Sequence, residues 1–405
     1  MNKIIIVGAG ASGLFCSLLL SKQGYDVTII EKNSKAGRKI LASGNGKCNI
    51  TNSNLSLENF NTSTNNNFIK YSIENMPFKK IKDLFYEMGL QIVKGDGTKI
   101  YPLSMQSSSV SEILYDTAIH NGVRIIFNEE IENIKCINEE YNLNNKYKCK
   151  YLILANGSNA MAKLGSSNSG YKFAKQFNHN ITTLLPSLVQ LKSDDKSLFS
   201  LSGVKVNAVV TLVTNNKNIK TISGDVLFTK YGISGNSILE LSRKSAFALD
   251  KNNKVLIHID LMPEYSSKKL FELLQNRKFL LKNKNSEFLL KSIINDKLIN
   301  YIFKLSNIVS DKIDNLTKQD ISNITHCIKN ININIKDTNG FENAEVVAGG
   351  IDLNEVCEKT MQSKKHKNLF FCGEILDVDG NCGGYNFHWA WSSAYTLANN
   401  FKGIK

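Results

Sequence analysis

The chain has 405 residues, of which 42% are hydrophobic and 21% are charged, and its formal net charge is +14. This length allows one large core or two to three smaller ones, and the composition excludes a disordered or fibrous chain. The positive charge is dispersed as lysines without a run of five like charges. Dispersed lysine usually forms a solvated face, so the charge alone disfavours a nucleic-acid partner.

Neither a metal site nor a membrane span is predicted. The eight cysteines form no C-x-x-C pair and no Cys/His cluster with zinc spacing. The chain opens with a strand-like run at residues 3–7 rather than with a signal peptide, and no stretch approaches about 20 apolar residues. We therefore expect a cytoplasmic protein with reduced thiols.

The first part of the chain alternates strands and helices. Residues 3–31 have a strand–helix–strand pattern, and polar composition predicts a surface loop at 59–67 and a hairpin or loop at 138–145. Amphipathic helices are predicted at 76–89 and 108–121, and strands at 123–127, 131–137 and 148–154.

The pattern changes after Pro186. Residues 204–213 and 219–228 alternate around an Asn-rich turn, which predicts an antiparallel hairpin, and residues 263–330 have helical spacing. A helix at 234–249 and strands at 254–260, 331–335 and 344–347 are also predicted, and the chain ends in a strand, a glycine-rich loop and a helix. We predict an α/β fold in which a Rossmann-like domain, residues 1–186 and 343–405, is interrupted by an insertion. The insertion comprises a β part, residues 187–262 and 331–342, and a helical subdomain, residues 263–330.

A glycine-rich turn predicts dinucleotide binding. The string Gly8-Ala9-Gly10-Ala11-Ser12-Gly13 follows a buried strand and opens a helix, and a second strand ends in the acidic Glu31. Gly8 allows the tight turn, Gly10 lets a pyrophosphate approach, and Gly13 lets helix and strand pack closely. Glu31 can accept hydrogen bonds from a ribose.

The residues after Glu31 favour FAD over NAD. Glycines, cations and amides follow in one loop that can wrap an extended anionic cofactor. Arg38, Lys39 and Lys47 are predicted near phosphate, and the neighbouring predicted contacts are Lys32, Ser43, Gly44, Gly46, Cys48 and Asn49.

Four motifs resemble the YhiN/BaiN-like FAD-dependent oxidoreductases, some of which are known as aminoacetone oxidases. They are G-R-K-x-x-x-S-G-x-G-x-C-N-x-T-N at 37–52, L-F-T with G-I-S-G at 227–235, K-T-M-Q-S-K at 359–364, and G-E-I-L-D-V-D-G with G-G-Y-N at 373–386. Gln362 stands where the family has an acid. The resemblance covers nearly the whole chain and implies a Rossmann-like FAD domain of the two-dinucleotide-binding type, interrupted by a β-barrel-like part and a helical part.

The resemblance also implies cofactor contacts outside the first motif. Ile131 would meet adenine through its backbone, and Asn156 departs from the threonine usual in the family's short A-T-G-type element. A helix start near the flavin would stabilise negative charge there. The implied contacts are Ile131, Ala155, Asn156, Gly157, Gly373, Glu374, Asp379, Gly384, Tyr385, Asn386 and Phe387.

Two absences in the sequence narrow the chemistry. Cys48 has no nearby cysteine partner, which argues against a dithiol reductase, and no second G-x-G-x-x-G follows a strand, so a nicotinamide donor would dock directly over the flavin. The substrate is expected on the open flavin face, between the FAD domain and the insertion, where Tyr385 and His388 can transfer protons. Candidate lining residues, which can equally pack an interface, are Tyr101, Tyr231, Tyr385, Asn386, His388 and Trp389. No catalytic residue is predicted.

Several functions remain open at this point. The leading one is an FAD-dependent reductase of a small organic molecule with NAD(P)H as hydride donor, and an aminoacetone-type amine oxidase is the alternative. A tRNA-acting flavoprotein and a non-catalytic redox sensor are further alternatives. The substrate, the choice of NADH or NADPH and the oligomeric state are not predicted.

Overall fold

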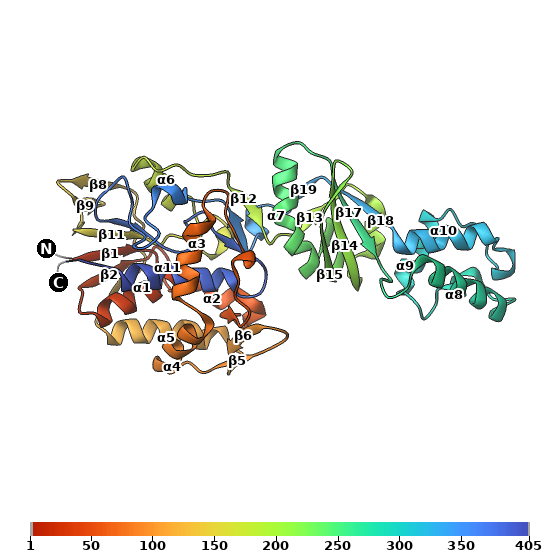
Figure 1. The fold of residues 1–405 in the computed structure, drawn as a ribbon, viewed down its shortest axis with the longest axis horizontal. Helices are drawn as coiled ribbons and strands as arrows, with labels where there is room; N and C mark the ends of the chain where they lie inside the picture. Colours follow the sequence, from red (N-terminus) through yellow and green to blue (C-terminus); the bar gives the residue numbers. More distant parts are fainter. Residues whose placement is uncertain (1–2, 404–405) are drawn as a thin grey trace. The chain divides into compact units, whose positions relative to one another are not determined.

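The computed structural model describes residues 3–403 and consists of two compact units (Figure 1). Unit 1 comprises Met1–Ser187 and Ala344–Lys405, and unit 2 comprises Leu188–Asn343. Each unit has its own hydrophobic core. The chain therefore leaves unit 1 once, builds unit 2 and returns.

Unit 1 is organised around a parallel five-stranded sheet in the order β21-β11-β1-β2-β7. Ile4 pairs with both Val27 and Tyr151, so the carboxyl ends of the three central strands lie at one edge of the sheet. All residues of these strands are buried, as expected for parallel strands covered on both faces. The five strands are β1 (Ile4–Val7), β2 (Val27–Ile30), β7 (Arg124–Ile126), β11 (Tyr151–Leu154) and β21 (Leu369–Phe371).

Helix α1 (Ala11–Lys22) packs against α5 (Ser107–His120) and α11 (Tyr385–Asn399). Every residue of α1 from Ser12 to Leu20 is buried, because the helix is apolar nearly all round. The other helices of unit 1 are α2 (Arg38–Ala42), α3 (Asn66–Asn75), α4 (Phe78–Glu87) and α6 (Ser169–Gln176). Its short strands are β3 (Thr51–Asn52), β4 (Phe60–Asn61), β5 (Ile92–Lys94), β6 (Lys99–Pro102), β8 (Ile134–Ile137), β9 (Glu140–Leu143), β10 (Tyr147–Cys149), β12 (Leu185–Ser187), β20 (Val346–Ala348) and β22 (Asp379–Gly380).

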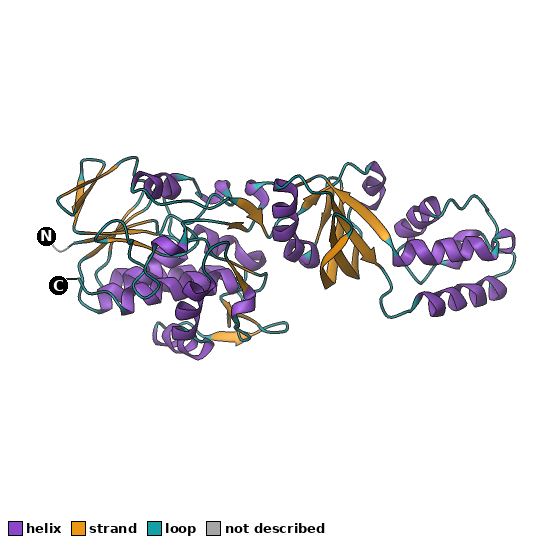
Figure 2. Ribbon diagram, turned by 45° about the horizontal axis from the view of Figure 1, so that its top comes forward, coloured by secondary structure: helices purple, strands orange, loops and turns teal. Residues whose placement is uncertain are grey.

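Unit 2 contains an antiparallel seven-stranded sheet in the order β18-β17-β14-β15-β16-β13-β19. Helix α7 (Asn236–Asp250) packs on this sheet, while α8 (Ser267–Leu280), α9 (Asp296–Leu305) and α10 (Lys318–Lys329) form a group between β17 and β18 in the chain (Figures 1 and 2). The strands are β13 (Leu191–Lys192), β14 (Lys205–Thr214), β15 (Lys217–Thr229), β16 (Gly232–Ser234), β17 (Val255–Asp260), β18 (Ile331–Ile335) and β19 (Asp337–Thr338).

Two local predictions are corrected by the structure, and a third is refined. The hairpin predicted at 138–145 is present, because β9 pairs antiparallel with β8 and with β10, but the strand predicted at 148–154 is split between a small antiparallel sheet and the main sheet. The segment 59–67 is more than a loop, because β4 pairs with β22 and α3 begins at Asn66. Its Asn-rich composition hid the helical spacing of the buried Phe68, Ile69 and Ile73.

Among residues 3–403, no helix is both long enough and apolar enough to span a membrane.

Candidate functional site

The three glycines in the turn between β1 and α1 have different surroundings. Gly8 has a φ of +107°, and a Cβ there would lie 2.6 Å from the carbonyl oxygen of Ala155. A Cβ on Gly13 would lie 2.0 Å from the carbonyl oxygen of Gly8, whereas a Cβ on Gly10 would meet nothing within 4 Å. The fold itself thus requires Gly8 and Gly13, while Gly10 faces open space where a ligand can approach.

The amino end of α1 has the properties of an anion site. Gly10 is its N-cap and provides no side-chain acceptor, and no acidic residue lies in the first turn. The first-turn N–H groups and the positive end of the helix dipole therefore have no anionic partner from the helix itself.

Glu31 is fixed at the end of β2 and is 8% exposed. Its Oε2 accepts a hydrogen bond from the backbone N–H of Ala9 at 2.7 Å, and its Oε1 accepts from the backbone and the amide of Asn33 at 2.8 and 2.6 Å. Asn33 Oδ1 accepts from Arg38 at 2.8 Å, so this asparagine links two predicted site residues. Sequence reasoning missed Asn33. Its signal was an amide, able to donate and accept, two residues after Glu31.

The loop after β2 is anchored beside the glycine turn. Gly37 donates its N–H to the carbonyl oxygen of Ala9 at 2.9 Å. Lys39 and Glu374, far apart in sequence, form an ion pair of 2.8 Å, and Glu374 also accepts from the backbone N–H of Val347 at 3.2 Å. The loop and the segment that follows β21 therefore meet at this site.

Other predicted cations of this loop have different surroundings. Arg38 also donates to the carbonyl oxygen of Lys163 at 3.0 Å, Lys32 lies 3.9 Å from Glu130, and Lys47 is exposed. The three cations thus do not converge through contacts with one another in the structure.

Cys48 is fully buried, and burial raises the pKa of its thiol to about 12, although a hydrogen bond with Ser43 opposes the shift. The thiol is protonated at neutral pH, which argues against a thiolate nucleophile. Nearby, Asn49 Oδ1 accepts from the N–H of Ile100 at 3.3 Å, and Gly44 and Gly46 have positive φ values. The hydrogen bond and the two glycine turns fix the backbone conformation of the loop.

The C-terminal block packs against the same loop. A Cβ on Gly384 would lie 2.5 Å from the carbonyl oxygen of Thr51, and the Asn52 amide donates to the carbonyl oxygen of Gly383 at 2.9 Å. A Cβ on Gly373 would lie 2.3 Å from Ser12 Oγ, beside the start of α1. Segments 8–13, 37–52 and 373–387 are therefore brought together.

The remaining predicted contacts have structural partners of their own. Asn156 donates to Ser169 Oγ at 3.3 Å, and Asn386 exchanges two hydrogen bonds of 2.8 Å with the backbone of Gly380. Asp379 is 1% exposed and Ile131 lies in the core, while Ala155 adjoins Gly8, Gly157 has a φ of +72° and Phe387 stacks on Trp391.

The substrate-lining prediction is wrong for His388 and Trp389, which are 0% and 1% exposed. Trp389 donates to the carbonyl oxygen of Gly373 at 3.1 Å. His388 Nδ1 lies 2.8 Å from Thr51 Oγ1, and desolvation lowers the pKa of its imidazole to about 3. Tyr385 is also buried and donates to the carbonyl oxygen of Asn54 at 3.1 Å. The inward face of α11 thus packs the core.

Tyr101 and Tyr231 belong to different units. Tyr101 is partly buried, and its ring lies against Gly95, where a Cβ would be 2.7 Å away. Tyr231 is 39% exposed on unit 2.

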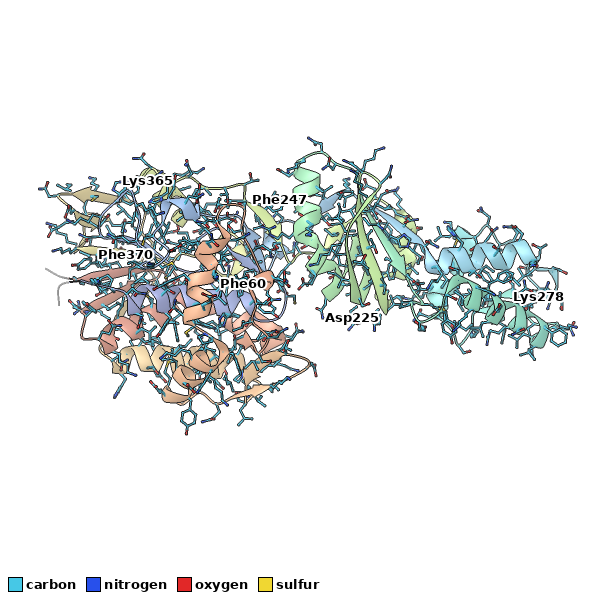
Figure 3. All side chains as sticks on the ribbon, in the orientation of Figure 1. Phe60, Asp225, Phe247, Lys278, Lys365 and Phe370 are labelled. Carbon is cyan, nitrogen blue, oxygen red and sulfur yellow. The ribbon has the colours of Figure 1, made fainter. Side chains whose placement is uncertain are left out.

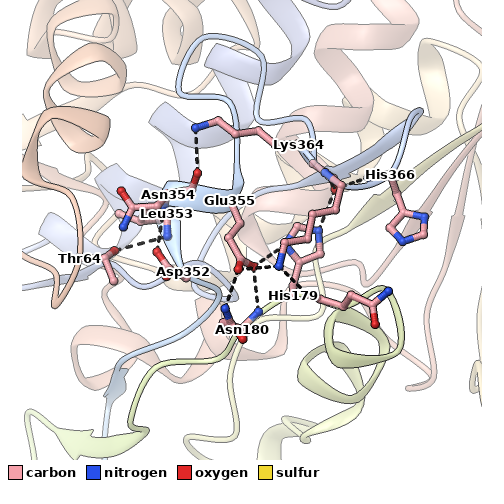
Figure 4. Close-up of polar contacts among 12 residues, drawn as sticks. Thr64, His179, Asn180, Asp352, Leu353, Asn354, Glu355, Lys364 and His366 are labelled. Atoms are coloured by element: carbon pink, nitrogen blue, oxygen red, sulfur yellow. Dashed lines mark hydrogen bonds and ion pairs between the residues drawn. The ribbon is translucent and has the colours of Figure 1, made fainter.

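A second polar cluster joins the segment after α6 to the loop before β21 (Figure 4). His179 lies between Glu355, at 3.3 Å from Nδ1, and Ser363, whose Oγ is 2.8 Å from Nε2. Lys365 completes the cluster with an ion pair of 2.6 Å to Glu355. Although these residues have the order of a hydrolytic triad, Ser363 Oγ accepts the backbone N–H groups of Lys365 and His366. The cluster therefore stabilises the loop.

A match to a protein family identifies this fold. The model for the HI0933-like protein Rossmann domain matches residues 2–400. The chain belongs to the HI0933-like family of FAD-dependent Rossmann proteins. The resemblance noted from the sequence is confirmed, and the protein is an FAD-dependent oxidoreductase.

Full-length relatives of this HI0933-like protein include enzymes with two kinds of name. A 3-dehydro-bile acid delta(4,6)-reductase of Clostridium scindens is 31% identical over 98% of both chains. A ribosomal RNA dihydrouridine synthase of Haemophilus influenzae is 30% identical over 97% of both chains, and one of Escherichia coli is 29% identical over 99% of this chain and 98% of that protein.

A solved structure supports the fold of the HI0933-like chain. The 3-ketosteroid delta1-dehydrogenase of Sterolibacterium denitrificans aligns with a TM-score of 0.52 at 12% identity, over 98% of this chain and 99% of that one. No cluster of three metal-ligating side chains occurs within residues 3–403. The open approach to Gly10 and the uncapped start of α1 fit the pyrophosphate of FAD.

Proposed function

We propose that this protein is an FAD-dependent reductase that adds hydrogen across a carbon–carbon double bond of a small organic molecule. The observation that carries this proposal is the full-length similarity to a delta(4,6)-reductase, at 31% identity. The name dihydrouridine synthase, borne by two further relatives, also denotes reduction of a double bond. In both named substrates the double bond is conjugated to a carbonyl, which is the class of alkene that we propose here.

The residues of the β1–α1 turn would hold the cofactor. The N–H groups at the start of α1 would bind its pyrophosphate, and Glu31, held by Ala9 and Asn33, would accept the ribose hydroxyls. The amino end of α11, capped by Gly384 without a side-chain acceptor, would direct its dipole toward the flavin. FAD, when bound, supplies hydride transfer. The other residues predicted to contact it keep that role as part of this proposal.

NAD(P)H would be a transient donor. The sequence has no second glycine-rich dinucleotide motif after a strand. The nicotinamide would therefore approach the flavin directly instead of occupying a domain of its own.

The test is anaerobic mixing of the FAD-loaded protein with NADH and with NADPH while the visible flavin absorbance is followed. Rapid bleaching by either donor, followed by recovery of the absorbance with an α,β-unsaturated ketone, supports the proposal. Bleaching by amines but not by either nicotinamide would contradict it and would favour the aminoacetone-type oxidase.

An RNA substrate is the second candidate. The 30% and 29% identity to ribosomal RNA dihydrouridine synthases favours it. Recovery of the flavin absorbance with a uridine-containing RNA, but not with small enones, would support this candidate over the first.

A further inference from the structure

The end of the α8 helix in unit 2 continues into a strongly basic segment. This segment, residues 277–291, runs from the last turn of α8 through the short helix η5 (Ser286–Leu289), and is here called the α8–η5 segment. Its only acidic residue is Glu287. Its basic residues are Arg277, Lys278, Lys282, Lys284 and Lys291.

The same segment exposes two aromatic rings next to its lysines. Phe279 is 69% exposed and Phe288 is 40% exposed. Lys282 Nζ lies 4.6 Å from the Phe279 ring centroid, and Lys284 and Lys291 lie 6.0 and 5.9 Å from that of Phe288. Single exposed apolar residues are common on proteins, but rings interleaved with cations form a surface that offers both stacking faces and positive charge.

The other two cations hold this segment in shape. The Arg277 guanidinium donates to the carbonyl oxygens of Phe288, Leu289 and Lys291 at 2.8 to 2.9 Å. The Lys278 ammonium, labelled in Figure 3, donates to the carbonyl oxygen of Leu316. The backbone that carries the two rings is therefore held in place before a ligand binds, which lowers the entropy cost of binding.

The three exposed lysines are available to a ligand. Lys282, Lys284 and Lys291 are all exposed. Among them, Lys291 lies 3.4 Å from Asp296, in an ion pair whose side chains are 50% and 70% exposed. Such an exposed pair is weak and is readily exchanged for a phosphate.

We propose that the α8–η5 segment is a docking surface for single-stranded RNA. Unpaired bases present faces that stack on Phe279 and Phe288, and their phosphates match the ammonium groups beside each ring. The complementary charge favours a polyanion, and the two exposed rings favour one with unstacked bases. The proposal rests on the RNA-acting candidate function for the identity of the polyanion.

The test measures binding of the full-length, FAD-loaded protein to a fluorescein-labelled, uridine-containing single-stranded RNA by anisotropy at several salt concentrations. One variant combines Lys282→Gln, Lys284→Gln and Lys291→Gln. Its matched control makes the same change in charge on unit 2 at Lys217, Lys251 and Lys254, which are also exposed. We expect the slope of log affinity against log salt to become shallower by about 2 in the first variant only.

A second variant, Phe279→Ala with Phe288→Ala, separates stacking from charge. We expect at least about thirtyfold weaker binding with an unchanged salt slope. Its control, Tyr86→Ala, removes a 65% exposed ring from α4 and should leave binding unchanged. Thermal unfolding of each variant checks that the fold is retained.

The absence of RNA binding by the wild type at low salt would overturn the proposal, and so would equal effects of the segment and control variants. Binding to anionic phosphatidylglycerol vesicles is measured as well. If the segment variants lost vesicle binding but kept RNA binding, the proposal would also be overturned. Bleaching of the flavin by NAD(P)H is measured on the same samples. The reductase proposal therefore stands or fails separately from this docking surface.

Discussion

At the scale of single residues, the glycine turn separates what the fold needs from what a ligand needs. Gly13 closes the contact between α1 and the backbone of Gly8, whereas Gly10 faces open space. A methyl group is therefore expected to have different consequences at these two neighbouring positions.

The Gly10→Ala variant should fold like the wild type but bind FAD at least about tenfold more weakly, because its new methyl group occupies the approach to the turn. The extended backbone of Gly10, with a φ of −76°, accepts alanine without strain. Gly13→Ala should instead lose about 3 kcal/mol of stability in the apoprotein through the clash with Gly8. FAD titration and chemical unfolding of both apoproteins test this pair. Equal stability of the two variants would contradict it.

A second prediction concerns the buried His388. Its imidazole has a pKa of about 3 in the folded protein, because desolvation disfavours the charged form, against about 6.5 in an unfolded chain. Between these values only the unfolded state binds the proton, so the stability that is complete above about pH 6.5 is lost as the pH falls. From about pH 6.5 to about pH 5 the loss should be about 2 kcal/mol.

Urea unfolding at the two pH values measures this loss. The His388→Gln variant is expected to be less stable but to depend less on pH. His179, whose pKa is lowered to about 4 mainly by desolvation, leaves a residual dependence of the same sign. An unchanged pH dependence in His388→Gln would refute the assignment to His388.

At the scale of elements, the sequence predicted the helices, strands and turns that depend on residues close together in the chain. The β1–α1–β2 unit and the β14–β15 hairpin follow from hydrophobic periodicity and turn composition, and both occur in the structure. The ion pair of Lys39 with Glu374 depends on the sheet topology, so no local pattern contains it. Helix α11 is apolar nearly all round, and its periodicity therefore could not distinguish core residues such as His388 and Trp389 from residues that face a ligand.

The α8–η5 segment provides a prediction at this scale. Replacing Arg277 by lysine keeps the charge but removes the planar fork that bonds three carbonyl oxygens. We expect a loss of about 1–2 kcal/mol and faster proteolysis within residues 281–292, with FAD binding unchanged. Limited proteolysis with mass mapping measures this. The control, Arg124→Lys, alters an exposed residue of β7 and should not change the cleavage pattern. Equal cleavage of the wild type and the Arg277→Lys variant would be inconsistent with the role given to Arg277.

At the scale of the whole molecule, two cores predict two unfolding transitions. The candidate FAD contacts all lie in unit 1, and the hydrophobic cluster of unit 2 is separate. FAD at about 100 times its Kd should stabilise unit 1 by about 2.7 kcal/mol and leave unit 2 unchanged. Differential scanning calorimetry with and without FAD should show one transition move. If both transitions moved equally, the two units would unfold together.

Because the chain returns to unit 1 at its C-terminal end, the two units are completed at different times during translation. Strand β21 pairs with β11, and Gly373 adjoins Ser12, so the candidate flavin site draws on residues from both ends of the chain. A ribosome releases the whole of Leu188–Asn343 before it releases these last segments. Unit 2 is one continuous stretch with its own core, so it can fold while the protein is still being made. We therefore expect FAD to bind only after translation has reached the C-terminal glycines.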